Sequence, residues 1–251
     1  MGKIKSIDEL NEHRNDAIKK IDSFISDLIN SDDNELNAKS DKFCYWLEDY
    51  IKFLRFESQF TPTSLKRYKR GEIIKVNLGF NIGSEEGGLH YAVVLDKNNS
   101  IYSPVLTIVP LTSVKPTTNI KALPKLSIYL GNELFTNLSS QIQLTNQHIS
   151  SERLRLKSFL DNNIFVGEDI ERITEEMRNL DKDLKLLNKM KKEITKMRKG
   201  SIALVNQITT ISKIRIYDPK TNHDILSNVR LSDQKLDSID AALISQYTGR
   251  K

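Results

Sequence analysis

The sequence predicts an α+β protein in which a small β-barrel carries a C-terminal helix, an N-terminal helical hairpin and a long, coiled-coil-like inserted helix. Three observations predict this class. Apolar residues recur three and four positions apart near the N-terminus, short β-rich runs begin after Gly71, and heptad spacing returns between the fourth and fifth of these runs. The expected domains are the hairpin at 1–60, the barrel at 65–139 and 200–251, and the helical insertion at 140–199.

Two amphipathic stripes predict the N-terminal hairpin. The first consists of Ile7, Leu10, Ala17, Ile21, Phe24 and Leu28, and the second of Phe43, Leu47, Tyr50 and Leu54. A polar stretch at 30–37 separates the stripes. We therefore expect two helices within residues 5–58, followed by a linker at 59–64, where Pro62 favours extended structure before it.

The barrel is predicted from six short runs that Gly, Pro, Asn or Ser residues bound. The runs are 73–78, 89–95, 105–111, 126–130, 202–205 and 214–217. Ser232 is a helix N-cap residue, and Leu236, Ile239, Leu243 and Tyr247 follow it at helical spacing. A helix is therefore expected to close the domain.

The inserted segment has the most regular periodicity of the chain. Its apolar positions are Ile170, Ile173, Met177, Leu180, Leu184, Leu187, Met190, Ile194 and Met197. A helix over 169–198 would be about 45 Å long, too long to pack only on a small barrel. Three partners are possible: the first helix with its own heptads, the preceding segment 150–160, or the same helix of a second subunit.

Composition narrows the class of protein. The 251 residues carry a net charge of +5, and the single cysteine, Cys44, excludes an internal disulfide. No run is apolar and long enough to span a membrane, so a soluble, cytoplasmic protein is expected. Residues 1–60 carry −4 (nine Lys/Arg, thirteen Asp/Glu) and the remainder +9 (29 against 20), and a basic body favours polyanions.

Several sequence blocks resemble the PemK/MazF family of toxins from toxin–antitoxin systems. They read YKRGEI at 68–73, GSEEGGLHYAVVL at 83–95, PLTS at 110–113 and GSIALVNQITTI at 200–211. The predicted helix that ends near Tyr247 is similar to the family's terminal helix. Several blocks in the family's order identify a family better than one motif does.

The resemblance implies an SH3-like barrel, usually a homodimer, that cleaves single-stranded RNA without a metal or other cofactor and is inhibited by an antitoxin. The family's catalytic threonine matches Thr112. Its catalytic arginine lies two positions after a Gly-Gly pair, and here that position is His90. The departure is chemically important because guanidinium stays charged, whereas imidazole titrates near neutral pH.

The residue chemistry is compatible with this activity. Metal-free RNA cleavage requires a base for the 2′-hydroxyl, an acid for the 5′-oxygen and donors for the phosphorane. His90 can act as base or acid, and Thr112 can donate a hydroxyl, although a histidine that opens an apolar strand is also typical of a hydrogen-bonded edge residue. Candidate RNA-binding residues are Lys69, Arg70, Ser84, Glu85, Gly87, Gly88, Ser113, Gln207 and Thr210.

Other interpretations stay open at this stage. With histidine at position 90, the fold could bind RNA or a partner helix as a regulator without cleaving RNA. A gyrase-inhibiting toxin is a third possibility, which the polar, basic C-terminal end 244–251 disfavours. The helical appendages could pack as a structural or dimerising coil. Alternatively, the acidic residues of 1–60 could cover the basic groove as a built-in antitoxin.

Overall fold

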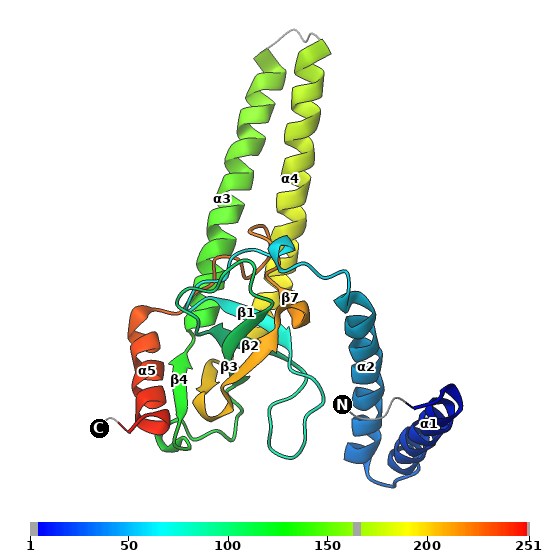
Figure 1. The fold of residues 1–251 in the computed structure, drawn as a ribbon. Helices are drawn as coiled ribbons and strands as arrows, with labels where there is room; N and C mark the ends of the chain where they lie inside the picture. The colour runs from blue at the N-terminus through cyan, green and yellow to red at the C-terminus, as the bar shows by residue number, and fades with distance from the viewer. Residues whose placement is uncertain (1–4, 163–166, 250–251) are drawn as a thin grey trace. The chain divides into compact units, whose positions relative to one another are not determined.

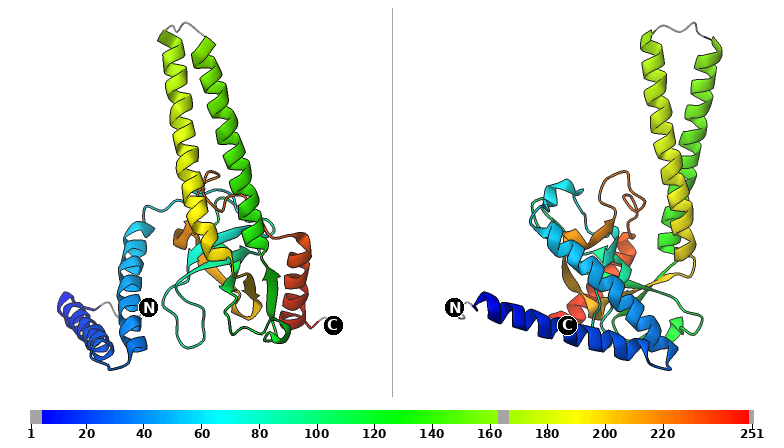
Figure 2. Two further views of the ribbon diagram at one scale, coloured as in Figure 1. Left: turned by 180° about the vertical axis from the view of Figure 1, so that it is seen from behind. Right: turned by 90° about the vertical axis from the view of Figure 1, so that its right-hand side faces the viewer.

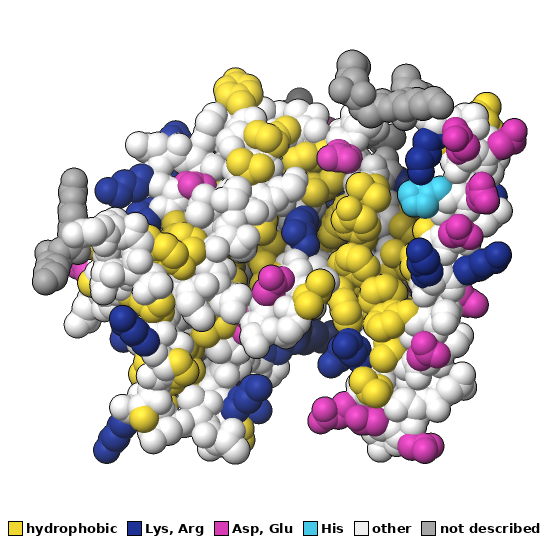
Figure 3. Space-filling view, turned by 60° about the horizontal axis from the view of Figure 1, so that its bottom comes forward, with side chains coloured by type: hydrophobic (Ala, Val, Ile, Leu, Met, Phe, Trp, Pro, Cys, Tyr) yellow, Lys and Arg dark blue, Asp and Glu magenta, His cyan; other side chains and the backbone are white. Residues whose placement is uncertain are grey.

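The computed structural model describes residues 5–162 and 167–249, which form two compact units that divide between Ser58 and Gln59. The first unit is the predicted helical hairpin of α1 (Ile7–Ile29) and α2 (Asn34–Glu57). Ser6 caps α1 in a capping box with Glu9, and Asp33 caps α2. Figure 3 shows the hydrophobic side chains of this pair in one band, with acidic side chains beside it. Phe24 of α1 packs edge-on against Phe43 of α2, which holds the two helices together.

The second unit contains a seven-stranded antiparallel sheet with the order β4-β5-β3-β2-β1-β7, and β6 pairs with the free part of β3. The strands are β1 (Ile73–Asn77), β2 (Leu89–Val94), β3 (Val105–Ser113), β4 (Ser127–Gly131), β5 (Ser201–Leu204), β6 (Thr209–Ser212) and β7 (Ile216–Asp218). Six strands match predicted runs, and β6 was not predicted.

The structure corrects the prediction of a closed barrel. A barrel requires each strand to bond to a neighbour on both sides. Among the described residues, β4 bonds only to β5, and β7 bonds only to β1 through a shifted register. The sheet is therefore open, and both of its faces need to be covered by other parts of the chain.

Alternation along the strands produces two apolar clusters on opposite faces of the sheet. One face contributes Ile73, Val93 and Val109, which pack with α3, α5 and the end of α4; the other contributes Ile74, Ala92 and Ile108, which pack with β6 and β7. The central strands are consequently buried on both faces. This double burial makes β2 and β3 a rigid platform for the side chains at their ends.

A helical hairpin leaves the sheet between β4 and β5. It consists of α3 (Glu133–Asn162) and α4 (Gly167–Ile194), which lie side by side in every view, with a short 3₁₀ turn, η3 (Thr195–Met197), after α4 (Figures 1 and 2). The helix expected over 169–198 is present as α4, and the preceding segment 150–160 belongs to a second helix, α3, which begins earlier than expected, at Glu133. Of the three possible partners for α4, the structure shows the preceding segment.

The C-terminal helix follows the prediction. Helix α5 (Asp233–Tyr247) begins after Ser232, whose side chain accepts a hydrogen bond from the Lys235 amide. Leu236 and Ile239 are buried against the sheet. The helix therefore covers the face of the sheet that it shares with α3.

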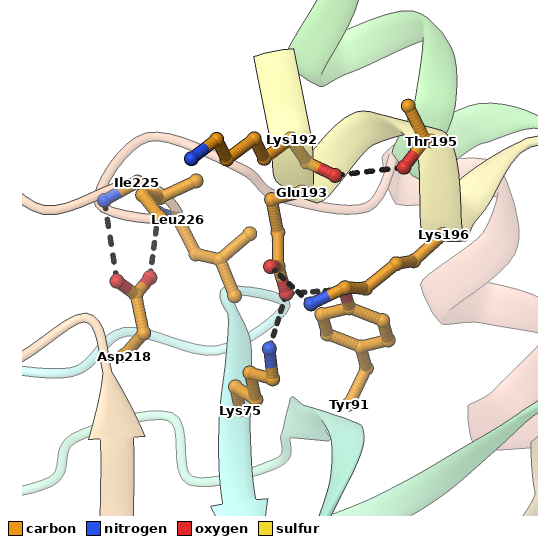
Figure 4. A network of polar contacts seen from close by, with 9 residues as sticks. All are labelled: Lys75, Tyr91, Lys192, Glu193, Thr195, Lys196, Asp218, Ile225 and Leu226. Carbon is orange, nitrogen blue, oxygen red and sulfur yellow. Dashed lines mark hydrogen bonds and ion pairs between the residues drawn. The ribbon is translucent and has the colours of Figure 1, made fainter. Parts of the chain in front are cut away.

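The base of α4 is tied to the sheet by a buried carboxylate, Glu193 (Figure 4). Glu193 accepts hydrogen bonds from Lys75 Nζ of β1, from Tyr91 Oη of β2 at 2.6 Å and from Lys196 Nζ at 3.0 Å. Burial alone would raise the pKa of Glu193, but these donors outweigh it and lower the pKa to about 2. The carboxylate of Glu193 thus joins β1, β2 and the base of α4.

Two leucines of α4 provide a matched test of the hairpin packing. Leu187 is 3% exposed and Leu184 is 37% exposed, although both are heptad positions. Leu187→Asp should lower the free energy of unfolding by about 3–5 kcal/mol because it buries an unpaired charge. Leu184→Asp should cost clearly less. Urea unfolding measures both, and equal losses for the two variants would contradict the packing of α4 on α3.

Glu193 provides a pH-dependent test of its junction with the sheet. Its pKa is depressed in the folded state, so its contribution to stability is present above its ordinary value near 4.5 and is lost as the pH falls toward 2. Glu193→Gln should cost about 1–3 kcal/mol at pH 7, and this difference from the parent should shrink below pH 4.5.

The matched control is Glu175→Gln, on the exposed part of the same helix, where the Glu175–Arg178 ion pair is largely solvated. It should change stability by less than about 0.5 kcal/mol. A Glu193→Gln variant as stable as this control at pH 7 would show that the junction does not hold α4.

Candidate active site

The loop between β1 and β2 borders the site. The Gly88 amide donates to the Gly79 carbonyl, and the Leu78 amide donates to the Gly88 carbonyl, which closes the loop at its base. Gly88 has φ +83°, a conformation that side chains disfavour. A Cβ on Gly87 would lie 2.9 Å from the Gly79 carbonyl oxygen. The Gly-Gly pair is therefore required by the loop's backbone.

Gln207, in the turn after β5, holds the tip of this loop. Its Nε2 donates to the Ser84 carbonyl at 3.0 Å, and its Oε1 accepts from the Glu86 amide at 3.4 Å. The predicted RNA-binding residues Ser84 and Gln207 are thus in direct contact. Glu85, Glu86 and Gln207 line a hollow of about 550 Å³ together with Thr209.

His90 lies at the start of β2, and its side chain is 25% exposed. Its Nδ1 lies 3.1 Å from the Leu111 carbonyl oxygen, and since a carbonyl only accepts, Nδ1 carries the hydrogen. Nε2 is therefore the atom that can gain or lose a proton. It lies 3.6 Å from the Glu86 carboxylate.

Thr112 lies on β3 beside this histidine. Tyr91 pairs with Leu111 across β2 and β3, so extending the register by one residue puts His90 opposite Thr112, on the same face of the sheet. Both line a groove of about 280 Å³, called here the His90 groove. Ser113, Lys115, Lys196 and Lys199 also line it. An imidazole, two hydroxyls and three ammonium groups therefore border one cavity.

Of the nine predicted RNA-binding residues, only Ser113 lines the His90 groove. Five others belong to the loop that precedes His90 or contact it: Ser84, Glu85, Gly87, Gly88 and Gln207. The remaining three, Lys69, Arg70 and Thr210, do neither. Arg70 forms an ion pair with Asp240 of α5 and donates to the Leu95 carbonyl, while Lys69 is exposed next to it. Gly71 bonds to Val94, so this segment lies at the opposite end of β2 from His90. Thr210 contacts Thr107 across β6 and β3 and lines neither cavity. We leave these residues out of the proposed catalytic groove.

Sequence analysis missed Lys196 and Lys199. Both follow the heptad segment, in the basic run 196–199 that directly precedes β5. Gly200 makes the turn between this basic run and β5. Its φ is +76°, and the Gly131 carbonyl oxygen lies 3.1 Å from the position that a Cβ would take. A basic run just before such a turn was the available signal.

The described residues offer no three-residue cluster of His, Cys, Asp or Glu suited to a metal ion. Within the same described ranges, no helix has the length and hydrophobicity of a bilayer span.

The domain combines an open antiparallel sheet with a Gly-Gly loop and a groove that histidine, threonine and lysine side chains line. Residues 69–188 match the family described as PemK-like, MazF-like toxin of type II toxin-antitoxin system. The match includes β1 to β4 and α3 and ends within α4. No curated protein matches the chain. Residues 69–188 are therefore similar to this toxin family.

The contact between Gln207 and the loop predicts how the loop moves. Gln207→Ala removes both hydrogen bonds, so amide hydrogens of residues 81–86 should exchange about tenfold faster with solvent. Hydrogen–deuterium exchange with mass spectrometry measures this change. Asn206→Ala, at the exposed neighbouring position, is the control and should leave exchange unchanged. Equal exchange in the parent and Gln207→Ala would mean that Gln207 does not hold the loop.

Proposed function

We propose that the protein is the toxin of a type II toxin–antitoxin system and acts as a metal-independent endoribonuclease on single-stranded RNA. The observation that carries this proposal is the groove that His90 and Thr112 share, in which Nε2 of His90 is the atom that can exchange a proton. The family match supports the toxin class.

The groove supplies the groups that cleavage requires. His90 Nε2 takes the proton of the 2′-hydroxyl, whose oxygen forms a bond to phosphorus, and Glu86 stabilises the imidazolium that results. The bond from phosphorus to the 5′-oxygen breaks, and that oxygen receives a proton from water or from a lysine ammonium. The products are a 2′,3′-cyclic phosphate and a 5′-hydroxyl end.

Cations and hydroxyls of the groove act on the phosphate. Lys196 and Lys199 stabilise the charge of the phosphorane, and Thr112 donates its hydroxyl to a phosphate oxygen. These lysines provide the permanent charge that a histidine at position 90 lacks. In this proposal Gln207 and Thr209, which line the hollow beside the loop, contact a neighbouring nucleotide.

The same proposal includes the partners. A cognate antitoxin, or residues 1–60 acting in cis, would inhibit the toxin by occupying its RNA-binding surface. We also propose a homodimer, as the resemblance to the family implies.

Substitution of His90 tests the catalytic assignment. His90→Ala should slow cleavage of single-stranded RNA by about 10²–10⁴, because a positioned proton-transfer group is lost, while RNA binding persists. Thr112→Val should also slow cleavage at nearly constant side-chain shape. His148→Ala, which removes an exposed histidine of α3, is the matched control and should cleave like the parent. Parent-like cleavage by His90→Ala would refute the assignment.

The arginine variant separates charge from proton transfer. His90→Arg restores the residue of the family and should keep part of the activity, with a flatter rate profile between about pH 5 and 8, because guanidinium does not titrate there. If the parent protein never cleaves RNA, and the variant binds RNA with the affinity of the parent, the protein would instead be an RNA-binding regulator.

A further inference from the structure

Helix α4 and the residues after it are divided by charge. Residues 167–181 hold six Asp/Glu and two Lys/Arg, whereas residues 182–199 hold eight Lys/Arg and two Asp/Glu. A helix dipole favours cations only within the last turn of a helix. Lys182, Lys185 and Lys189 lie well before that turn, so the dipole does not explain them.

Six lysines of the basic half follow helical spacing, four of them on one side of α4 and two in the turns after it. They follow one another at spacings of 3, 4, 3, 4 and 3 residues: Lys182, Lys185, Lys189, Lys192, Lys196 and Lys199. All six are exposed, whereas Leu187, Met190 and Met197 of the other side are buried. We call these six residues the lysine stripe.

The lysine stripe joins two cavities. Lys196 and Lys199 line the His90 groove. Lys182, Lys185 and Lys189 line a second groove of about 450 Å³, together with Tyr217 of β7 and residues of the segment after that strand. Lys192 lies between them, and its side chain points away from the Glu193 network in Figure 4. A continuous line of cations thus leads from one groove to the other.

The acidic residues nearby do not neutralise this line. Asp218 and Asp224 line the second groove, but both carboxylates accept backbone amide hydrogen bonds, Asp218 from Leu226 at 2.8 Å and Asp224 from Thr221 at 2.7 Å. Among the described residues, Asp181 pairs with Lys185 and Glu193 with Lys196, and both of these lysines are more than half exposed. The ammonium groups therefore stay accessible to a polyanion.

We propose that the lysine stripe is a track on which single-stranded RNA continues out of the His90 groove toward the second groove. The proposal rests on the proposed function and extends its RNA-binding surface. The part of the stripe within α4, from Lys182 to Lys192, is about 15 Å long, which suits roughly four phosphates at the 3.4 Å spacing of a stacked strand. Lys196 in η3 and Lys199 in the following turn extend it into the His90 groove. Tyr217, which is 43% exposed, offers a base a face for stacking at the far end.

An acidic protein partner fits this surface less well. Protein interfaces need a buried apolar or aromatic centre, whereas the stripe consists of lysines. Lysine ammonium groups bind phosphates as point charges without a required orientation, which suits a sequence-independent contact. The structure therefore favours an extended phosphate backbone as the occupant.

The test uses the full chain with Lys182→Gln, Lys185→Gln and Lys189→Gln combined. These residues lie outside the His90 groove, so kcat should stay at the parent value. Affinity for a single-stranded RNA of about 30 nucleotides should fall about tenfold, and the slope of log affinity against log salt should drop by about 2. An RNA of about 5 nucleotides, which fills only the groove, should be cleaved with unchanged kcat and KM.

The control combines Lys97→Gln, Lys121→Gln and Lys157→Gln, which removes the same charge from exposed positions outside the stripe. It should bind the long RNA like the parent. If the parent cleaves RNA and the stripe variant binds the long RNA as the control does, the track is wrong. The track is also wrong if the stripe variant keeps its affinity for RNA and loses affinity only for an antitoxin. If the parent neither binds nor cleaves RNA, the proposed function itself fails.

Discussion

The burial of one carboxylate, Glu193, determines how the two helices of the hairpin meet the sheet. A buried charge is costly unless donors surround it. Here the donors come from Lys75 of β1, Tyr91 of β2 and Lys196 after α4. Because the donors belong to separate elements, the base of α4 satisfies its carboxylate in one position only. The hairpin is thereby fixed to β1 and to β2, the strand that carries His90.

This junction also shapes the groove. Tyr91 and Lys196 belong both to the Glu193 network and to the lining of the His90 groove, and Lys199 follows within one turn. A hairpin that looks like an appendage in the sequence thus brings cations to the centre of the site. In our proposal these cations provide the charge that a family arginine would provide, which leaves His90 free to exchange a proton.

The sequence predicts those features of the fold and the site that depend on residues close together in the chain. Heptad spacing locates α1 and α4, and the antiparallel register of β2 and β3 brings His90 beside Thr112. Of helix α3, only 150–160 was offered as a possible partner of α4, and its start at Glu133 was not predicted, because its apolar stripe is incomplete: Leu144 and Leu154 are exposed, and polar residues surround them. Arg70 was placed at the RNA surface because nothing local reveals its ion pair with Asp240, 170 positions later.

The central claim is that the His90 groove cleaves RNA with its own side chains. The most direct test incubates the parent protein with a long single-stranded RNA in EDTA and maps the chemistry of the cut ends. The account predicts discrete cuts that leave 2′,3′-cyclic phosphate and 5′-hydroxyl ends. RNA that stays intact in EDTA, or that is cut only after a divalent metal is added, would contradict it.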